Sequence, residues 1–193
     1  TGEFVISGDM DNNTGSVDLT SGSNTIVSST TPDSSSVKMS VDGLGIEGFS
    51  SADRGMLKIL DGSDELSVDA NLKDERGSLV IKKGDVSVEA SGDKVNKTGS
   101  LSAIIGSNEL DGILTTDSSS LNLKSGSVEF SVSGDRNGDA GSLSFKEGSV
   151  ETRLGFDKVQ ESGEIYINDG SDYILVKGNK QENKGLIDLS QSS

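Results

Sequence analysis

Apolar and polar residues alternate in short stretches along most of the chain, and a glycine interrupts each stretch. In the segment SSLNLKSGSVEFSVS, Leu121 and Leu123 alternate with Asn122, and the pattern resumes at Val128 and Phe130 after the glycine. Successive side chains of an extended strand point to opposite faces, so a period of two predicts β-strands with one apolar face.

The alternating stretches recur at a nearly constant spacing. Small residues open successive units at intervals of 21, 19, 22, 22, 20, 22, 22 and 22 residues, at Gly15, Ser36, Gly55, Gly77, Gly99, Ser119, Gly141, Gly163 and Gly185. A glycine lies seven residues after each of the first eight openings, at positions 22, 43, 62, 84, 106, 126, 148 and 170. The unit opened by Ser36 fits worst, since Val37, Met39 and Val41 are one position out of phase. A period of about 22 residues predicts a repeat architecture.

The mid-repeat glycines are typical of two-residue hairpin turns, in which glycine takes the position that needs positive φ. Two turn classes are expected. In one class the glycine comes second, at Lys83-Gly84, Ser125-Gly126 and Glu147-Gly148; in the other it precedes serine, at Gly22-Ser23, Gly62-Ser63, Gly106-Ser107 and Gly170-Ser171. Each turn sets a register, and each predicted register brings apolar residues together on one face.

The predicted pairs differ between the two turn classes. A turn at Lys83-Gly84 pairs Ile81 with Val86 and Leu79 with Val88, and a turn at Ser125-Gly126 pairs Leu123 with Val128 and Leu121 with Phe130. The Gly-Ser turns pair Ile59 with Leu66, Leu57 with Val68, Ile167 with Ile174 and Ile165 with Val176. Across the polar junction SGDRNGDAG, Phe130 is expected opposite Phe145 and Val132 opposite Leu143.

These patterns predict an all-β protein, a repetitive antiparallel β-meander of about 22-residue hairpin repeats. The alternatives are a parallel β-helix or β-solenoid, whose coils have a similar length, and a trimeric β-spiral. We expect a single β-repeat domain over residues 1–193, with less regular repeats in 1–54 and regular repeats in 55–193. The pattern resembles the long antiparallel meander of the spirochaetal outer surface protein A, with its glycine-centred hairpins and Lys/Glu/Ser outer faces. This resemblance covers the pattern and no specific motif.

Composition limits how such a sheet can be covered. Only 31% of the 193 residues are hydrophobic and 4% aromatic, against about 45–50% apolar residues in average globular domains. A thick two-layer core is hard to build from so few apolar side chains. We therefore expect a thin apolar face completed by identical chains, plausibly three, or by a larger assembly.

Charge and missing residue types exclude several functions. A net charge of -15 argues against binding nucleic acid or an anionic membrane surface, and no apolar run reaches the roughly 20 residues of a membrane span. The chain has no His or Cys, the usual residues of metal ligation and nucleophilic catalysis, and it has no Trp that could stack on a sugar. We expect no enzyme activity and no cofactor.

Two polar loops are calcium candidates. Oxygen-bearing side chains alternate at Asp135, Asn137 and Asp139, and again at Asp9, Asp11 and Asn13, as in loops that point alternate residues at a calcium ion. Neither loop has the other features of an EF-hand, and these residue types are also common in ordinary turns. Calcium is thus the single cofactor for which candidate ligands exist.

Carboxylate pairs flank two of the turns, Asp61 with Asp64 and Asp169 with Asp172. Such pairs serve in glycoside hydrolysis, but at exposed turns nothing apolar would raise the pKa of one member. Tyr166 and Leu175 should pair on the otherwise polar face. They are either a local patch covered by the chain end or a partner contact.

The sequence therefore favours a non-enzymatic structural repeat protein of a virion fibre or spike, or of an extracellular surface appendage. We expect it to be located outside the cell, at the cell surface or in a virion. The alternatives are a cell-surface adhesin or carbohydrate-binding module and, on the β-helix interpretation, a polysaccharide-degrading enzyme.

Overall fold

Eighteen antiparallel strands and no helix make up the described part of the protein. The computed structural model describes residues 2–191, and inter-residue contacts group the chain into two compact units, residues 1–95 and 96–193. Unit 1 contains β1 (Gly2–Asp9), β2 (Thr14–Ser21), β3 (Asn24–Thr30), β4 (Ser34–Val41), β5 (Leu44–Ser51), β6 (Arg54–Asp61), β7 (Asp64–Asn71), β8 (Arg76–Lys83) and β9 (Val86–Asp93).

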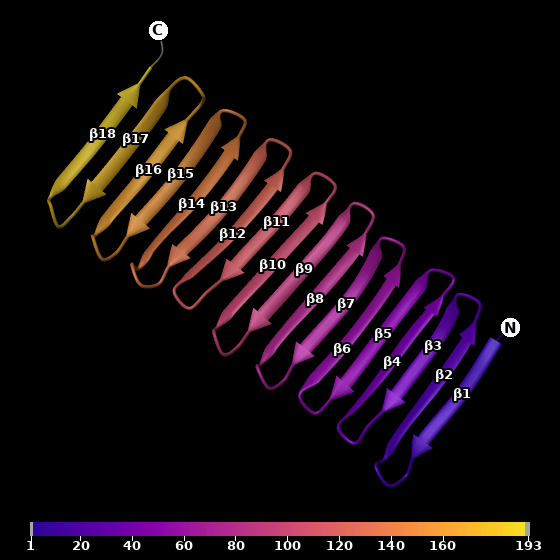
Figure 1. Ribbon diagram of the computed structural model, residues 1–193. Coiled ribbons are helices and arrows are strands. Elements are labelled where there is room, and N and C mark those ends of the chain that lie inside the picture. The colour runs from indigo at the N-terminus through magenta and orange to yellow at the C-terminus, as the bar shows by residue number, and fades with distance from the viewer. Residues whose placement is uncertain (1, 192–193) are drawn as a thin grey trace. The chain divides into compact units, whose positions relative to one another are not determined.

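Unit 2 repeats this arrangement. It contains β10 (Thr98–Ile105), β11 (Asn108–Leu114), β12 (Ser118–Ser125), β13 (Val128–Asp135), β14 (Ala140–Glu147), β15 (Val150–Asp157), β16 (Ser162–Asn168), β17 (Tyr173–Asn179) and β18 (Lys184–Ser190). Within each unit every strand pairs antiparallel with its neighbours in sequence (Figure 1). The predicted β-meander is confirmed, and the parallel β-helix and trimeric β-spiral are excluded as folds of this chain. No helix that could cross a membrane occurs in residues 2–191.

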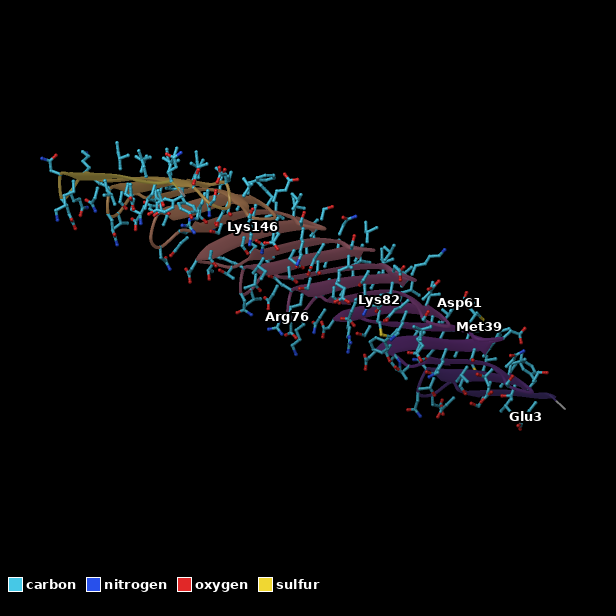
Figure 2. All side chains as sticks on the ribbon, turned by 90° about the horizontal axis from the view of Figure 1, so that it is seen from above. Glu3, Met39, Asp61, Arg76, Lys82 and Lys146 are labelled. Carbon is cyan, nitrogen blue, oxygen red and sulfur yellow. The ribbon has the colours of Figure 1, made fainter. Side chains whose placement is uncertain are left out.

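Each unit is one strand layer thick, so neither has an interior. Side chains project from both faces of the layer (Figure 2), and among the described residues no side chain, apolar or polar, is buried. Burial between layers normally supplies most of a domain's stability. Here the strands are stabilised by backbone hydrogen bonds and by contacts between side chains on neighbouring strands, each worth about 0.2–1 kcal/mol.

All eight mid-repeat glycines adopt positive φ, between 56° at Gly84 and 105° at Gly170. In six hairpins the glycine is the first of two turn residues, and the second residue is not among the described non-glycine residues with positive φ. That combination is a type II′ turn. Only Asp42-Gly43 places the glycine second, with φ of 49° and 92°, as a type I′ turn requires.

The predicted registers divide by turn class. At the Gly62 and Gly170 turns all four predicted pairs are confirmed, including Ile59 with Leu66 and Ile167 with Ile174. The junction pairs Phe130 with Phe145 and Val132 with Leu143 are confirmed as well.

The predicted X-Gly turns, and the registers that followed from them, were wrong. The turn at Gly84 is Gly84-Asp85, so Ile81 pairs with Val88 and Leu79 with Ala90. The turn at Gly126 is Gly126-Ser127, so Leu123 pairs with Phe130 and Leu121 with Val132. Likewise Glu147 pairs with Val150 across Gly148-Ser149.

The turn backbone explains this correction. A type I′ turn at Lys83-Gly84 would force Lys83 into positive φ, which is unfavourable for a residue with a Cβ atom. A type II′ turn starting at Gly84 needs positive φ only at the glycine. Both registers place the same apolar residues on the same face, since they differ by two residues on the partner strand. The alternation of apolar and polar residues therefore could not distinguish the two registers.

The poor fit of the unit opened by Ser36 also has a structural cause. In β4, Ser35 rather than Ser36 shares a face with Val37 and Met39, and Ser35 pairs with Ser50. The alternating pattern of this repeat therefore begins at Ser35, one residue before the predicted opening at Ser36. The shift moves the turn glycine to the second position, at Gly43.

Substituting the turn glycine should cost stability through φ alone. No atom lies within 4 Å of a Cβ built on Gly62 (φ 60°), and the same is true of Gly55 within the same hairpin, which has no positive φ. We expect Gly62→Ala to lower the free energy of unfolding by about 1–2 kcal/mol, measured by urea denaturation. Gly55→Ala is the matched control and should leave stability unchanged or raise it. Equal losses in both variants would contradict the role given to φ.

Candidate functional site

Apolar side chains are aligned on one face of unit 2. Two cross-strand rows run over all nine strands of the unit, one through Leu101, Gly112, Leu121, Val132, Leu143, Leu154, Ile165, Val176 and Ile187, the other through Ala103, Leu110, Leu123, Phe130, Phe145, Thr152, Ile167, Ile174 and Leu189. Neither row contains a charged residue. Even in the middle of the face Leu143 keeps 36% of its surface exposed, because no second layer covers it.

Unit 1 has an apolar face of the same design. Its rows pass through Ile6, Val17, Ser28, Val37, Gly48, Leu57, Val68, Leu79 and Ala90, and through Phe4, Leu19, Ile26, Met39, Ile46, Ile59, Leu66, Ile81 and Val88. These rows are also without charge. Each unit thus presents an uncovered apolar face, which we call the apolar face throughout.

The opposite face, here called the polar face, carries charges of alternating sign. In unit 2, Glu109, Lys124, Glu129, Lys146 and Glu151 lie directly opposite one another on five consecutive strands. In unit 1, Lys38 Nζ lies 2.8 Å from Glu47 Oε1, and Lys82 Nζ lies 2.9 Å from Glu89 Oε1. Opposite charges across strands stabilise the pairing modestly.

Glu164 is the centre of the most connected ion-pair group on this face. Its Oε2 lies 2.8 Å from Lys177 Nζ, and its Oε1 lies 3.2 Å from Arg153 Nη2. The hydrogen bond from Lys177, followed by the positive charges of Lys177 and Arg153, lowers the pKa of Glu164 despite partial desolvation. The carboxylate is therefore ionised at neutral pH.

Next to Glu164 lies the aromatic cluster, formed by Tyr166, Tyr173, Leu175 and Arg153. Tyr166 pairs with Leu175 as the sequence predicted. The two tyrosine rings are 6.1 Å apart and tilted by 37°, and the Arg153 guanidinium lies 5.0 Å from the centre of the Tyr166 ring. Such a cation–π contact is favourable at exposed sites.

The chain end borders this cluster. Tyr173 Oη donates a hydrogen bond of 3.0 Å to Asp188 Oδ2 in β18, and this bond together with the Asp188 charge raises the pKa of Tyr173. Tyr166, Tyr173 and Leu175 are half-buried against one another, while Arg153 is exposed. Sequence reasoning missed Tyr173 and Arg153. The signal for Arg153 was the β15–β16 register, which sets it opposite Tyr166.

The candidate calcium loop at residues 135–139 uses its oxygens internally. Asp135 Oδ1 accepts hydrogen bonds from the backbone N–H groups of Asn137 (2.9 Å) and Gly138 (3.1 Å). Asp139 has φ of 45°, and its Oδ2 lies 3.1 Å from Lys158 Nζ. These are the bonds of a capped turn.

The second candidate loop has the same character. Asp9 Oδ1 accepts from the backbone N–H groups of Asp11 (2.9 Å) and Asn12 (3.1 Å), and Asn13 has φ of 50°. Bonds from Asn12 are the main cause that lowers the pKa of Asp9. Across residues 2–191, no three acidic side chains gather as a metal site would require. Calcium binding at either loop remains a prediction from spacing.

The flanking carboxylate pairs lie at turns. Asp61 is opposite Asp64, and Asp64 Oδ1 accepts a 3.2 Å hydrogen bond from the Gly84 backbone N–H. Asp169 Oδ1 accepts from the backbone N–H groups of Asp172 and Ser171, and these bonds lower its pKa. A general acid needs the opposite shift, upward toward neutral pH.

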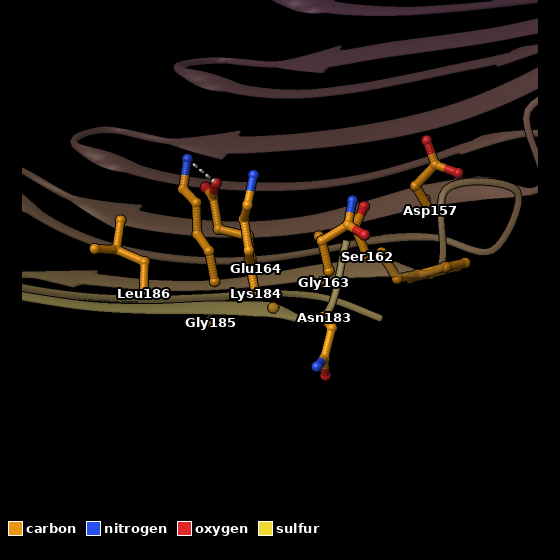
Figure 3. A pocket seen from close by; sticks show the side chains of 14 residues that line it. Asp157, Ser162, Gly163, Glu164, Asn183, Lys184, Gly185 and Leu186 are labelled. Carbon is orange, nitrogen blue, oxygen red and sulfur yellow. Dashed lines mark ion pairs between the residues drawn. The ribbon is translucent and has the colours of Figure 1, made fainter. Parts of the chain in front are cut away.

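A row of small residues beside the apolar rows was not anticipated as a surface. In unit 2, Gly163 is opposite Gly178, which is opposite Gly185, and a groove of about 820 Å³ follows these glycines. Figure 3 shows Glu164 and Lys184 on one side of the sheet here and Asn183 on the other. The sequence did contain a signal for this row. The small residues that open the repeats, such as Gly141, Gly163 and Gly185, lie in it.

Phe156 interrupts the glycine row. A Cβ atom on Gly141 would lie 2.6 Å from Phe156 Cζ and 2.7 Å from Cε1, so the ring lies directly over the Gly141 backbone. An aromatic residue that covers a glycine on the neighbouring strand restores side-chain contact where glycine has none. The ring itself stays 63% exposed.

No protein-family model matches this sequence, and no curated protein matches it. The function is therefore inferred from the apolar face, the polar face and the aromatic cluster.

Removing the charge of Glu164 should destabilise the sheet in a pH-dependent way. Because its pKa is lowered on folding, its stabilisation is complete above the pKa of an unfolded glutamate, about 4.3, and is lost as the pH falls through the folded value. We expect Glu164→Gln to cost at most about 1 kcal/mol at pH 7 and less at pH 3. Urea denaturation at both values measures this.

Glu129→Gln is the matched control. Its carboxylate lies 3.8 Å from Lys124 and its side chain is 52% exposed, so its loss at pH 7 should be smaller. A Glu164→Gln effect that persists unchanged at pH 3 would show that ionisation is not its source.

Proposed function

We propose that this protein is a non-enzymatic structural repeat protein that builds a homo-oligomer or larger assembly through its apolar faces. The observation that carries the proposal is the uncovered apolar face in a protein with no buried described residue. Large contiguous apolar surfaces on soluble proteins normally mark interaction sites. A second copy is the partner that always accompanies such a face.

The size of the face suits association. Nine strands spaced by about 4.8 Å and three facing rows spaced by about 6.7 Å, the two apolar rows and the row of small residues beside them, give roughly 850 Å² per unit. Stable protein interfaces bury about 800 Å² on each partner. Two apolar faces in contact would therefore make an interface of ordinary size.

The distribution of charge supports the same arrangement. The chain has a net charge of -15, which opposes association where like charges meet. In the two apolar rows of each unit no charged residue occurs, so these rows can meet those of another copy without bringing charges together. The cost of self-repulsion falls with distance and with salt.

We further propose that the assembly belongs to a virion fibre or spike, or to an extracellular or cell-surface appendage. Short turns and regular rows suit a repetitive structural part, and the polar face keeps its outside hydrated. Electron microscopy of the native source tests the location. Absence of the chain from any fibre or surface structure would contradict it.

A carbohydrate-binding adhesin is the second candidate, and the aromatic cluster favours it. Two tyrosine rings 6.1 Å apart, with Arg153 and Glu164 beside them, combine apolar ring surface and polar hydrogen-bonding groups. Titration with a panel of oligosaccharides tests this function. Binding that is lost in Tyr173→Ala would support it.

One charge placed on the apolar face should break the association. We expect Leu143→Glu to lower the mass measured by sedimentation at micromolar concentration below that of the wild type, because it buries an unpaired carboxylate in the interface of unit 2. Ser144→Glu, next in β14 but on the polar face, is the matched control and should keep the wild-type mass. Circular dichroism of both variants checks that the sheet is intact. A wild-type monomer at these concentrations would overturn the proposed face association.

A further inference from the structure

Several junction loops, which join one repeat to the next, share the same cap. A side-chain oxygen of the first loop residue accepts a hydrogen bond from the backbone N–H three residues further on. The pairs are Asp9 with Asn12 (3.1 Å), Asn71 with Asp74 (3.0 Å), Asp157 with Gln160 (2.8 Å) and Asn179 with Glu182 (2.9 Å). Asp and Asn commonly bind the backbone of their own turns in this way. The cap is therefore a recurring part of the repeat.

In the loop between β13 and β14 the capped residue is a glycine. Asp135 Oδ1 accepts a hydrogen bond of 3.1 Å from the backbone N–H of Gly138. The residue before this glycine is Asn137, and Asn137-Gly138 is the one Asn-Gly pair in the sequence. The Asn137 side chain is exposed. The cap thus holds the backbone nitrogen that directly follows an exposed asparagine.

An asparagine in this setting can lose its amide without an enzyme. The nitrogen of Gly138 gives up its proton and forms a bond to Asn137 Cγ, the bond from Cγ to Nδ2 breaks, and ammonia leaves. Water then opens the resulting succinimide ring at either carbonyl and leaves aspartate or iso-aspartate. Glycine permits this attack best, because it has no Cβ atom beside the attacking nitrogen.

The cap opposes this reaction. The attacking nitrogen must lose its proton and approach Asn137 Cγ, but in the capped loop its N–H is donated to the Asp135 carboxylate. A charged acceptor makes this bond stronger than one between neutral groups. The other carboxylate oxygen is also close, since a Cβ atom built on Gly138 would lie 3.2 Å from Asp135 Oδ2. The nitrogen is therefore engaged with Asp135 instead of Asn137.

We propose that Asn137 is a site of spontaneous deamidation, and that the Asp135 cap slows this reaction while the β13–β14 junction is folded. The inference does not depend on the proposed self-association, because it concerns one loop of one chain. Elsewhere the cap only stabilises a turn, whereas here it also protects a reactive pair of residues.

Deamidation would change a junction that aligns two repeats. Aspartate at position 137 adds a carboxylate between Asp135 and Asp139, and like charges so close together repel each other. Iso-aspartate also carries the main chain through the side-chain carbon, which lengthens the loop. Phe130 and Phe145 are paired across this loop, so a lengthened loop disturbs the register of β13 with β14.

Mass spectrometry measures the reaction directly. Folded wild-type protein and the same protein in urea are incubated at mildly alkaline pH and quenched in acid, and a lysine-specific protease releases the peptide that lies between Lys124 and Lys146. We expect Asn137 to convert at least about tenfold more slowly in the folded protein, because unfolding removes a hydrogen bond to a charged group. Asn183, exposed in the loop before β18 and followed by Lys184, is the internal control and should convert more slowly than Asn137 in urea.

Substitution of Asp135 tests the cap. Asp135→Ala removes the acceptor and should raise the conversion rate of the folded protein about tenfold. Asp135→Asn is the matched control, because Asn71 and Asn179 accept the same hydrogen bond at the same loop position. It should therefore stay closer to the wild-type rate than Asp135→Ala does. Circular dichroism checks that the sheet of each variant is intact.

Lys158→Ala separates loss of the cap from a general loosening of the loop. It removes the 3.1 Å ion pair with Asp139 and leaves the cap in place, so the conversion rate should remain near that of the wild type. A rate that rises as much as in Asp135→Ala would overturn the role of the cap. So would equal rates in folded and urea-treated wild type, or an Asp135→Ala rate no higher than that of the wild type. Absence of conversion in urea would overturn the site itself.

Discussion

Strand pairing without a second layer is the constraint on which this structure depends. No described side chain is buried, so stability cannot come from an interior as it does in ordinary domains. It comes from the backbone ladder and from rows of side chains that cross the strands. Each row is continuous because every strand keeps the register of its neighbours. A slip in one hairpin would break all rows at that point, and the regularity of the turns is therefore as important as the choice of side chains.

This constraint separates the chemistry of the two faces. Apolar rows occupy one face, and alternating charges such as Glu129 and Lys146 occupy the other. Two carboxylates, Glu164 on the polar face and Asp169 at a turn, accept hydrogen bonds that lower their pKa and keep them ionised. The aromatic cluster is the exception on the polar face, since Tyr166 and Tyr173 bring apolar rings among ion pairs. A flat surface of this kind recognises other surfaces more readily than it encloses a small substrate.

The parts of the fold that sequence reasoning predicted share a local cause. Hairpins at Gly62 and Gly170 followed from a Gly-Ser turn between two alternating stretches, and their registers were right. At Gly84 and Gly126 the same reasoning failed by one turn position. The alternation of apolar and polar residues does not distinguish the two turn positions, because both registers keep each side chain on the same face. The backbone decided it, since only a type II′ turn confines positive φ to the glycine.

The sequence by itself determined which residues share a face and where the chain turns, because both depend on neighbours within one repeat. It also indicated the Tyr166–Leu175 pair, which lies within a single hairpin. Apart from the junction between β13 and β14, where Phe130 was predicted opposite Phe145, only the tertiary structure decided which residues of different repeats align. The Arg153–Tyr166 contact and the alignment of Gly178 with Gly185 cross junction loops whose geometry no period specifies. The physical reason is that face membership repeats every two residues, whereas alignment across a junction depends on the backbone path of each loop.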